Sequence, residues 1–355
     1  MKKGVVVSHG EANWKNIGDY IQTIAAQQFA GPDSLLLERE ALFAYAGAPV
    51  RLLMNAWFMH HPERFPPAAN ISPLFVSFHL TPRVRDRFFT PAVITYLKAH
   101  EPIGCRDTET VESMTEHGIR AFYTSCLTLT LGRSYRHVER SSAPVFVDPW
   151  FRRLEPFGWF RFAFRFLSLL PYMATHLGVL CRLHRRCSGA FRTFRGAAHR
   201  SVRWLYTVEF HRAYSPLFAN EVLLGAEYVT HKLWVRNCPG ETDRIVLADA
   251  LLKKYEQAPF VVTSRLHCAL PCTGMGTPVW VPFHSGMASG RYGGNEEFLN
   301  LLPVDGRGIV TSPTSTGTAD GRIHLDTRPP LRTEYRPFAD RLTAAARAFM
   351  EGTDT

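Results

Sequence analysis

The sequence predicts an α/β protein in which parallel strands and helices alternate through two successive halves. Short apolar runs, beginning at residues 4–8, are followed by segments with helical periodicity. This alternation is typical of a doubly wound sheet with helices on both faces. The chain has 355 residues, long enough for two domains with separate cores. A new buried run at residues 144–149 marks the start of the expected second half.

In the first half, apolar runs bounded by polar turns indicate the strands, and 3.6-residue periodicity indicates the helices. Asn16 or Asp19 is expected to cap the first helix. Because the loop before that helix follows the first strand, these residues could instead face a ligand. The predicted strands cover residues 4–8, 34–38, 50–58, 75–80, 103–105 and 121–123, the predicted helices cover residues 20–29, 88–100 and 108–117, and residues 127–131 form a closing loop.

The second half repeats the pattern around a long interruption. We expect an N-terminal domain over residues 1–143, a C-terminal domain over residues 144–335 with an insertion at about 151–215, and a C-terminal helix and tail over residues 336–355. The predicted strands cover residues 144–149, 226–231, 260–262 and 279–283, and the predicted helices cover residues 243–254, 266–274 and 337–350.

The net charge of +10 belongs to the insertion. Residues 151–212 contain twelve arginines and two acidic residues, Glu155 and Glu209, so the rest of the chain is neutral. The arginines interleave with aromatic residues between Phe157 and Leu170. Such a segment predicts either a helix that contacts a membrane surface or a helical insertion packed on the fold with solvated arginines. We expect no nucleic-acid partner.

The cysteines and the lack of targeting signals favour a cytoplasmic protein. Seven cysteines are scattered without the spacing of a disulfide framework or a zinc site, which is typical of reduced thiols. The short apolar run after Lys2 and Lys3 is not a signal peptide pattern. The sequence also lacks a dinucleotide fingerprint, a Walker loop and a metal-ligand motif, so we expect no metal and no cofactor.

The strongest candidate site lies at residues 263–267, where a predicted strand ends and a helix begins. Ligands of open α/β sheets bind beyond the carboxyl ends of strands, and the first turn of a helix offers N–H groups to anions. Arg265 and His267 stand at this point, and Arg106 occupies the equivalent position in the first half. Arginine binds phosphate or carboxylate through two donors, and histidine exchanges protons near neutral pH. The set predicts a small anionic substrate.

Four motifs in this order resemble the polysaccharide pyruvyl transferase family: NIGD at residues 16–19, GCRDTET at 104–110, SCLTL at 125–129 and TSRLH at 263–267. The resemblance covers most of the chain outside residues 151–215. It implies two Rossmann-like domains similar to the glycosyltransferase B (GT-B) fold, with the acceptor side in the first domain, the donor side in the second and the active site in the cleft between them.

The resemblance also implies phosphoenolpyruvate as the donor substrate and a glycan, in many members a lipid-linked oligosaccharide at the cytoplasmic membrane face, as the acceptor. The product would be a cyclic pyruvate ketal. The implied catalytic residues are His267, Arg265 and Asp19; the donor-binding residues are Arg106, Arg265, His267, Ser264 and Arg291; and the acceptor-binding residues are Asn16, Asp19, His79 and His284. His267 would act as a general acid or as a phosphate ligand.

Two other functions remain open from the sequence. One is a glycosyltransferase that uses a nucleotide sugar on the same fold, although no ribose-binding acidic residue is evident in the second half. The other is a noncatalytic scaffold that binds glycan or membrane, in which Arg265 and His267 have only a structural role.

Overall fold

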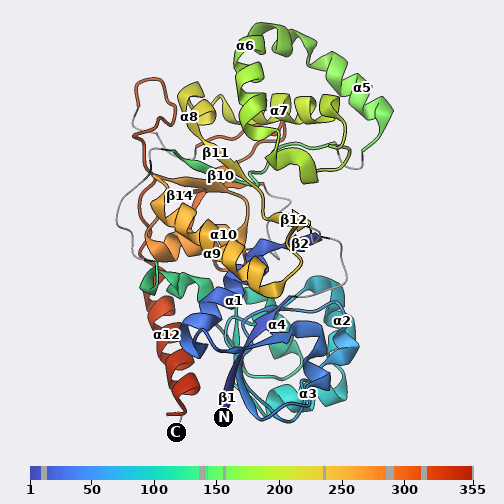
Figure 1. Ribbon diagram of the computed structural model, residues 1–355, viewed down its shortest axis with the longest axis vertical. Coiled ribbons are helices and arrows are strands. Elements are labelled where there is room, and N and C mark those ends of the chain that lie inside the picture. The colour runs from blue at the N-terminus through green and yellow to red at the C-terminus, as the bar shows by residue number, and fades with distance from the viewer. Residues whose placement is uncertain are drawn as a thin grey trace.

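The computed structural model describes residues 1–8, 14–135, 141, 143–154, 157–234, 237–284, 292–312 and 318–353. It confirms a mixed α/β fold with two parallel sheets, one above the other in Figure 1. The first sheet has the order β3-β1-β4-β6, and the second has the order β11-β10-β13-β14-β15. The strands of the first sheet are β1 (Lys2–Val7), β3 (Leu35–Glu38), β4 (Val50–Leu53) and β6 (Ile71–Leu74); those of the second are β10 (Val145–Val147), β11 (Glu227–Val229), β13 (Val261–Thr263), β14 (Val279–Phe283) and β15 (Asn300–Pro303).

Three two-stranded pairs complete the β structure. Two are parallel pairs within the first half, and the third is antiparallel and joins the two halves because β12 runs alongside β2. The pairs are β5 (Trp57–Phe58) with β7 (His79–Leu80), β8 (Ile103–Cys105) with β9 (Ala121–Tyr123), and β2 (Trp14–Asn16) with β12 (Lys232–Trp234).

The helices cover both faces of each sheet. Helices α1, α9, α10 and α12 lie between the two sheets or beside them, whereas α5 to α8 stand at the end of the molecule opposite both termini (Figure 1). The helices are α1 (Ile17–Ala30), α2 (Arg85–Phe88), α3 (Pro91–Lys98), α4 (Thr108–Glu116), α5 (Trp159–Ser168), α6 (Leu170–Cys187), α7 (Arg200–Tyr214), α8 (Asn220–Gly225), α9 (Glu241–Gln257), α10 (Leu266–Met275) and α12 (Arg336–Glu351).

The largest core is shared by both halves. Alternate residues of a strand point to opposite faces of its sheet, and β10 shows the consequence. Val145 and Val147 join the central core with α1, α9 and α10, whereas Phe146 faces the insertion and contacts Phe210 and Tyr214 of α7. The insertion therefore covers the outer face of the second sheet.

Several predicted elements of the first half differ from the structure. The strand expected at residues 50–58 is two strands, because the chain leaves the sheet after Leu53 and Asn55 donates a side-chain hydrogen bond to the carbonyl of Gln22 in α1. In the segment predicted at residues 75–80, only His79–Leu80 is a strand, and Ser77 has a positive φ of 55°. The helix expected at 88–100 begins at Pro91, with Thr90 as its cap.

Candidate active site

The junction of β13 and α10 holds Arg265 in a defined position. Arg265 is the N-cap residue of α10, and its backbone N–H donates to Oγ1 of Thr263 at 3.0 Å. The Thr263 hydroxyl in turn donates to the carbonyl of Val147 in the neighbouring strand β10. The side chain of Arg265 is fixed separately, because its Nε donates to Oδ2 of Asp148 at 2.8 Å.

Asp148 directly follows β10 and is buried, with a positive φ of 41°. Its Oδ2 also accepts the backbone N–H of His231 at 3.0 Å. Burial alone would raise the pKa of Asp148, but the charge of Arg265 and the contacts with His231 outweigh it and lower the pKa. Asp148 is thus a carboxylate that orients Arg265 from the side.

Arg106 reaches the same place from the first half. It directly follows β8 and is buried, and its Nη1 lies 3.4 Å from Nε2 of His267. Arginine has no acceptor, so in this contact His267 Nε2 carries a lone pair and not a proton. The Nε of Arg106 is buried without a hydrogen-bond partner among the described residues. The structure therefore brings together Arg106, His267 and, two residues before His267, Arg265.

Asp107 and His79 form a buried pair behind Arg106. Nδ1 of His79 lies 2.5 Å from Oδ2 of Asp107, and Oδ1 of Asp107 caps α4 by accepting the N–H of Thr110. Burial and the charge of Arg106 lower the pKa of His79 to about 4. Burial opposes ionisation of Asp107, but its contacts with His79 and Arg106 prevail and lower its pKa to about 2. Neutral His79 thus donates to ionised Asp107, which lies 3.6 Å from Arg106 Nε.

The first turn of α1 packs directly on His267. A Cβ added to Gly18 would lie 3.1 Å from Cβ of His267, so the two elements approach closely here and glycine fits without any shift of its neighbours. Asn16 caps the helix by accepting the N–H of Gly18, and its Nδ2 donates to Oδ1 of Asp19 at 3.0 Å. Burial raises the pKa of Asp19 against the opposing charges of Arg39 and Arg106, although part of its surface is accessible. Asp19 is a carboxyl that is suited to exchange a proton.

The other predicted site residues have different surroundings. The hydroxyl of Ser264 accepts the N–H of Trp150 at 2.8 Å and lies 3.3 Å from the carbonyl of Pro282, so it holds the β13 turn in place. His284 stacks on the ring of Trp150 with 4.9 Å between centroids. His79 is buried beside Asp107 and not on an open surface. Arg291 lies outside the described residues.

Several residues of the site were not predicted from the sequence. Asn295 is buried and accepts the hydroxyl of Ser125 at 2.5 Å, and its Nδ2 donates to the carbonyl of Arg106. Tyr292 donates its hydroxyl to the carbonyl of Ser264. The segment at residues 292–295 thus ties the Arg106 turn to the Arg265 turn. Asp148 could have been found, since it follows a buried strand just as Arg265 does; Asn295 has no such signal.

His231 is a further buried residue of this junction. Its carbonyl accepts the N–H of Ile17 at 2.8 Å, and its Nε2 lies 2.8 Å from the hydroxyl of Tyr255. Burial lowers the pKa of His231 to about 3, so the ring is neutral. Its Nδ1 is buried without a hydrogen-bond partner among the described residues, and it faces the first turn of α1 at Gly18.

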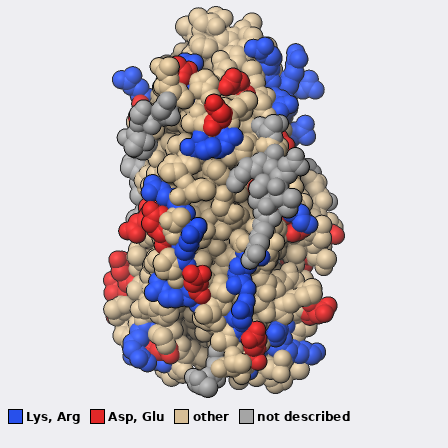
Figure 2. Space-filling model, turned by 90° about the vertical axis from the view of Figure 1, so that its left-hand side faces the viewer, with Lys and Arg blue, Asp and Glu red and all other residues tan. Residues whose placement is uncertain are grey.

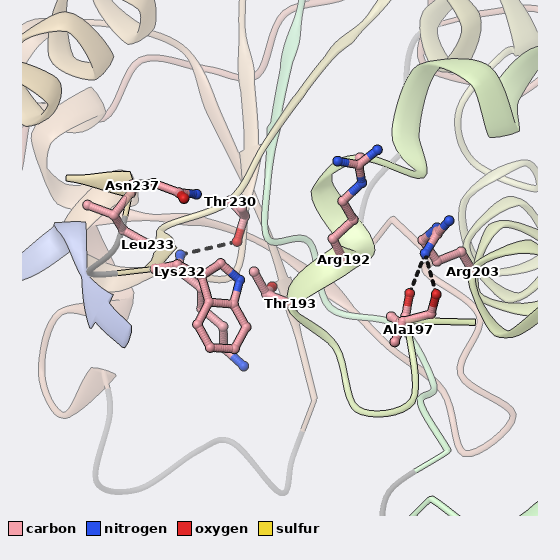
Figure 3. A pocket seen from close by; sticks show the side chains of 11 residues that line it. Arg192, Thr193, Ala197, Arg203, Thr230, Lys232, Leu233 and Asn237 are labelled. Carbon is pink, nitrogen blue, oxygen red and sulfur yellow. Dashed lines mark hydrogen bonds between the residues drawn. The ribbon is translucent and has the colours of Figure 1, made fainter. Parts of the chain in front are cut away.

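A pocket of about 460 Å³ opens beside the β2–β12 pair (Figure 3). The insertion forms one wall with Arg192, Thr193 and Arg203, and β12 forms the other with Lys232 and Trp234. Thr230, which also lines it, precedes His231, whose backbone N–H donates to Asp148, so the pocket adjoins the Arg265 ion pair. Its mixture of cationic, hydroxyl and aromatic side chains is suited to a polar ligand with flat apolar faces.

The arrangement combines two guanidinium groups, an imidazole and a protonatable carboxyl where the two halves meet. Guanidinium groups hold phosphate and carboxylate oxygens, and the imidazole and carboxyl can move protons. Among the described residues, no group of three or more His, Cys, Asp or Glu side chains is placed to hold a metal ion.

Comparison with known proteins finds a match to one family. A family model described as polysaccharide pyruvyl transferase matches residues 74–281, more than half of the chain. No curated protein and no solved structure matches the chain. The match spans Arg106, Asp148, Arg265 and His267.

Proposed function

Because the chain belongs to the polysaccharide pyruvyl transferase family, we propose that it transfers pyruvate from phosphoenolpyruvate to two hydroxyls of a sugar unit as a cyclic ketal. The observation that carries this proposal is the meeting of Arg106 from the first half with His267, next to Arg265 from the second. A donor with one phosphate and one carboxylate needs two such cationic groups on either side of a proton donor.

The proposed reaction proceeds by protonation of the donor methylene carbon while a sugar hydroxyl attacks the adjacent carbon. The C–O bond to phosphate then breaks, and the second sugar hydroxyl closes the ketal. One hydroxyl proton replaces the proton given to the methylene carbon, and the other is released with the phosphate. Arg265, oriented by Asp148, and Arg106 hold the two anionic groups of the donor. The arginine that holds the phosphate also stabilises the negative charge that builds up on this group as it leaves.

In this proposal His267 changes partner when the donor binds. Without a ligand, its Nε2 accepts from Arg106. A bound dianion attracts both side chains, so Arg106 turns to the anion and Nε2 takes up a proton. His267 is then a cation beside the donor, able to act as the general acid. Asp19, whose pKa is raised by burial, accepts the proton of the attacking hydroxyl.

The finer points of fold and acceptor belong to the same proposal. The two parallel sheets and the junction residues support a GT-B-like arrangement with the acceptor bound on the α1 side. We propose a polysaccharide precursor, linked to lipid at the cytoplasmic face of a membrane, as the acceptor. The pocket at Trp234 would receive its neighbouring sugars, because sugar C–H faces stack on aromatic rings and sugar hydroxyls bond to Lys232 and Arg203.

The test measures donor binding and turnover separately. Calorimetry with phosphoenolpyruvate needs no acceptor, and Arg265→Gln should weaken binding at least about tenfold by loss of a charge-assisted contact. His267→Asn should keep most of the binding and lose about a hundredfold or more in phosphate release with a panel of glycans. The exposed Arg307→Gln serves as the control.

Two results would reject the proposal. Tight phosphoenolpyruvate binding by Arg265→Gln would remove Arg265 from the donor site. Turnover of a nucleotide sugar, with no binding of phosphoenolpyruvate by the wild-type protein, would favour a glycosyltransferase. A product heavier than the acceptor by one pyruvate ketal would support the proposed reaction.

A further inference from the structure

Helix α5 presents an apolar face that nothing in the described structure covers. None of its residues is buried, and Phe160, Phe164 and Leu167 are 94%, 77% and 63% exposed. Spacings of three and four residues place these side chains on one side of the helix. Trp159, at the start of the helix, is also more than half exposed. Exposure of large apolar side chains on this scale marks an interaction surface.

The opposite side of α5 fixes its orientation. Phe162 and Phe166 pack on a small core formed by α6 and α7. Arg165 forms an ion pair with Glu209 of α7, where Nη2 lies 3.0 Å from Oε2. The outward direction of Phe160, Phe164 and Leu167 is therefore determined by packing on the other side. We call these three residues with Trp159 the α5 face.

The charge around the α5 face is positive. Of the two acidic residues in the insertion sequence, Glu209 is buried and paired with Arg165 and Arg212. Exposed arginines remain on the described surface of the insertion at Arg161, Arg182, Arg185, Arg192, Arg195 and Arg200. Figure 2 views the molecule from the side away from α5; basic side chains gather at its upper right edge there, and acidic side chains also lie in its upper part.

We infer that the α5 face docks on an anionic lipid surface, with α5 parallel to the membrane and its aromatic side chains inserted at the headgroup level. Tryptophan and phenylalanine next to arginine are the residues that such interfacial helices use. Arginine clusters attract anionic headgroups over about one Debye length, so they need not lie on the inserted face itself.

The helix lies on the membrane and does not cross it. Among the described residues, no single helix has both the length and the apolarity of a membrane span; α5 and α6 reach them only as a pair bent by 79°. Leu183 and Cys187 hold α6 in the core on the outer face of the second sheet. Straightening the pair would remove either α6 from that core or Phe162 and Phe166 of α5 from their packing on α6 and α7.

The experiment uses the full chain and vesicles of phosphatidylcholine with or without phosphatidylglycerol. Point variants are required, because α7 covers Phe146 and deletion of the insertion would expose the sheet. Flotation should show wild-type protein on anionic vesicles, with loss at high salt. The variant F160S/F164S/L167S should bind these vesicles at least about tenfold more weakly than the wild type. The control V246S/L331S changes exposed apolar residues on other segments, 63% and 58% exposed, and should bind as the wild type does.

Two more measurements identify the partner. The variant R182Q/R185Q should lose affinity for anionic vesicles only. The blue shift of tryptophan fluorescence on vesicle binding should shrink in Trp159→Phe. Equal flotation of wild type and F160S/F164S/L167S, or no flotation of the wild type, would overturn the inference. A change of mass in light scattering caused by the triple variant would also overturn it, because the face would then be covered by a second copy.

The inference does not depend on the proposed reaction. The α5 face is remote in sequence from the four motifs, so the triple variant should bind phosphoenolpyruvate as the wild type does. Loss of vesicle binding with intact donor binding supports the lipid surface, and failure of donor binding in the wild type would affect only the proposed reaction.

Discussion

Asp148 shows how one carboxylate can set the geometry of a site that it need not touch. It holds Arg265 through Nε and is itself fixed by the N–H of His231. Contact through Nε leaves the terminal nitrogens Nη1 and Nη2 as the donors for a bound anion. Asp148 is therefore a positioning residue in the proposed reaction.

Asp148→Asn keeps the shape of the side chain and removes its charge. We expect affinity for phosphoenolpyruvate to fall about tenfold, because Arg265 loses a charge-assisted partner worth on the order of 1.5 kcal/mol. Calorimetry checks the affinity, and circular dichroism checks that the fold is retained. Unchanged affinity would show that Arg265 needs no support from Asp148.

The buried pair of His79 and Asp107 predicts how stability depends on pH. The pKa of His79 is about 4 when folded and near 6.5 when unfolded, so the unfolded state binds a proton first as pH falls. The contribution of neutral His79 to the free energy of unfolding is fully present above pH 6.5 and is lost as pH falls towards 4. The pKa of Asp107, about 2 when folded, extends the loss from near pH 4 downwards.

His79→Asn should remove the first of these losses. The free energy of unfolding of the wild type should fall more between pH 7 and 4.5 than that of the variant, by about 2 kcal/mol. Urea unfolding at several pH values measures both. His61→Asn, at a more exposed position, should follow the wild type. Parallel pH profiles for wild type and His79→Asn would contradict the assignment.

At the residue scale, sequence reasoning found the cations and missed their partners. Arg106, Arg265 and His267 were predicted because each follows a strand; Arg106 contacts His267, and the Arg265 side chain pairs with Asp148. The Arg265–Asp148 pair depends on β10 lying beside β13, and that strand order has no local signal. His79 was expected at the acceptor, but a histidine at a strand end looks the same whether it faces solvent or a buried carboxylate.

At the scale of elements, the first turn of α1 and the start of α10 form one packed unit. Gly18 allows it, because an added Cβ would also lie 3.3 Å from Asn16 Oδ1 and from His231 Nδ1. The side chains of Asn16, His231 and His267 would each have to shift by a few tenths of an ångström to accommodate a Cβ there.

Gly18→Ala should therefore reduce activity more than stability. We expect phosphate release to fall about tenfold or more through displacement of His267. The free energy of unfolding should change by about 1 kcal/mol, because a few tenths of an ångström relieve the contact. Gly178→Ala in α6, where a Cβ meets no atom within 4 Å, is the matched control and should keep activity. Equal activity in both variants would refute the close packing.

Local sequence signals predicted most helices and strands, but they failed where contacts with distant parts of the chain determine where an element begins or ends. The helix predicted at residues 108–117 is Thr108–Glu116, and its ends follow local backbone rules, with Asp107 as the cap and Gly118 at a positive φ of 67° after it. The segment at residues 50–58 contains no glycine or proline that would mark the end of a strand. Its division into two strands is evident only from its packing against α1. Residues 127–131 were expected as a loop and form most of a 3-10 helix, Leu127–Arg133.

For the whole molecule, the central core joins the halves by direct contact of backbone with backbone. Gly132, at the end of that 3-10 helix, faces Gly274 of α10, and a Cβ on Gly132 would lie 2.1 Å from the carbonyl oxygen of Gly274. A Cβ on Gly274 would lie 2.3 Å from the carbonyl oxygen of Leu129. Two sheets were predicted from the sequence, but this shared core was not.

Gly274→Ala tests the contact between the halves. Backbone cannot move aside as a flexible side chain can, so we expect a loss of about 2–3 kcal/mol in the free energy of unfolding. Thermal or urea unfolding measures the loss. Gly225→Ala, where a Cβ meets no atom within 4 Å, should lie within about 1 kcal/mol of the wild type. An unchanged free energy of unfolding in Gly274→Ala would show that the backbone contact between α10 and the 3-10 helix contributes little to stability.

The bond between Asp148 and His231 also has an evolutionary consequence. Asp148 follows β10, just before the insertion, and His231 follows β11, so the bond joins the carboxyl ends of these adjacent parallel strands. The whole insertion therefore lies within one crossover between neighbouring parallel strands; it leaves the sheet at the site and returns to it at the opposite end of β11. Helices α5 and α6 can lengthen, shorten or be exchanged between relatives while Arg265 stays in place, provided that a helix such as α7 still covers Phe146. The part of the molecule that meets its surroundings can diverge without moving the part that carries the chemistry.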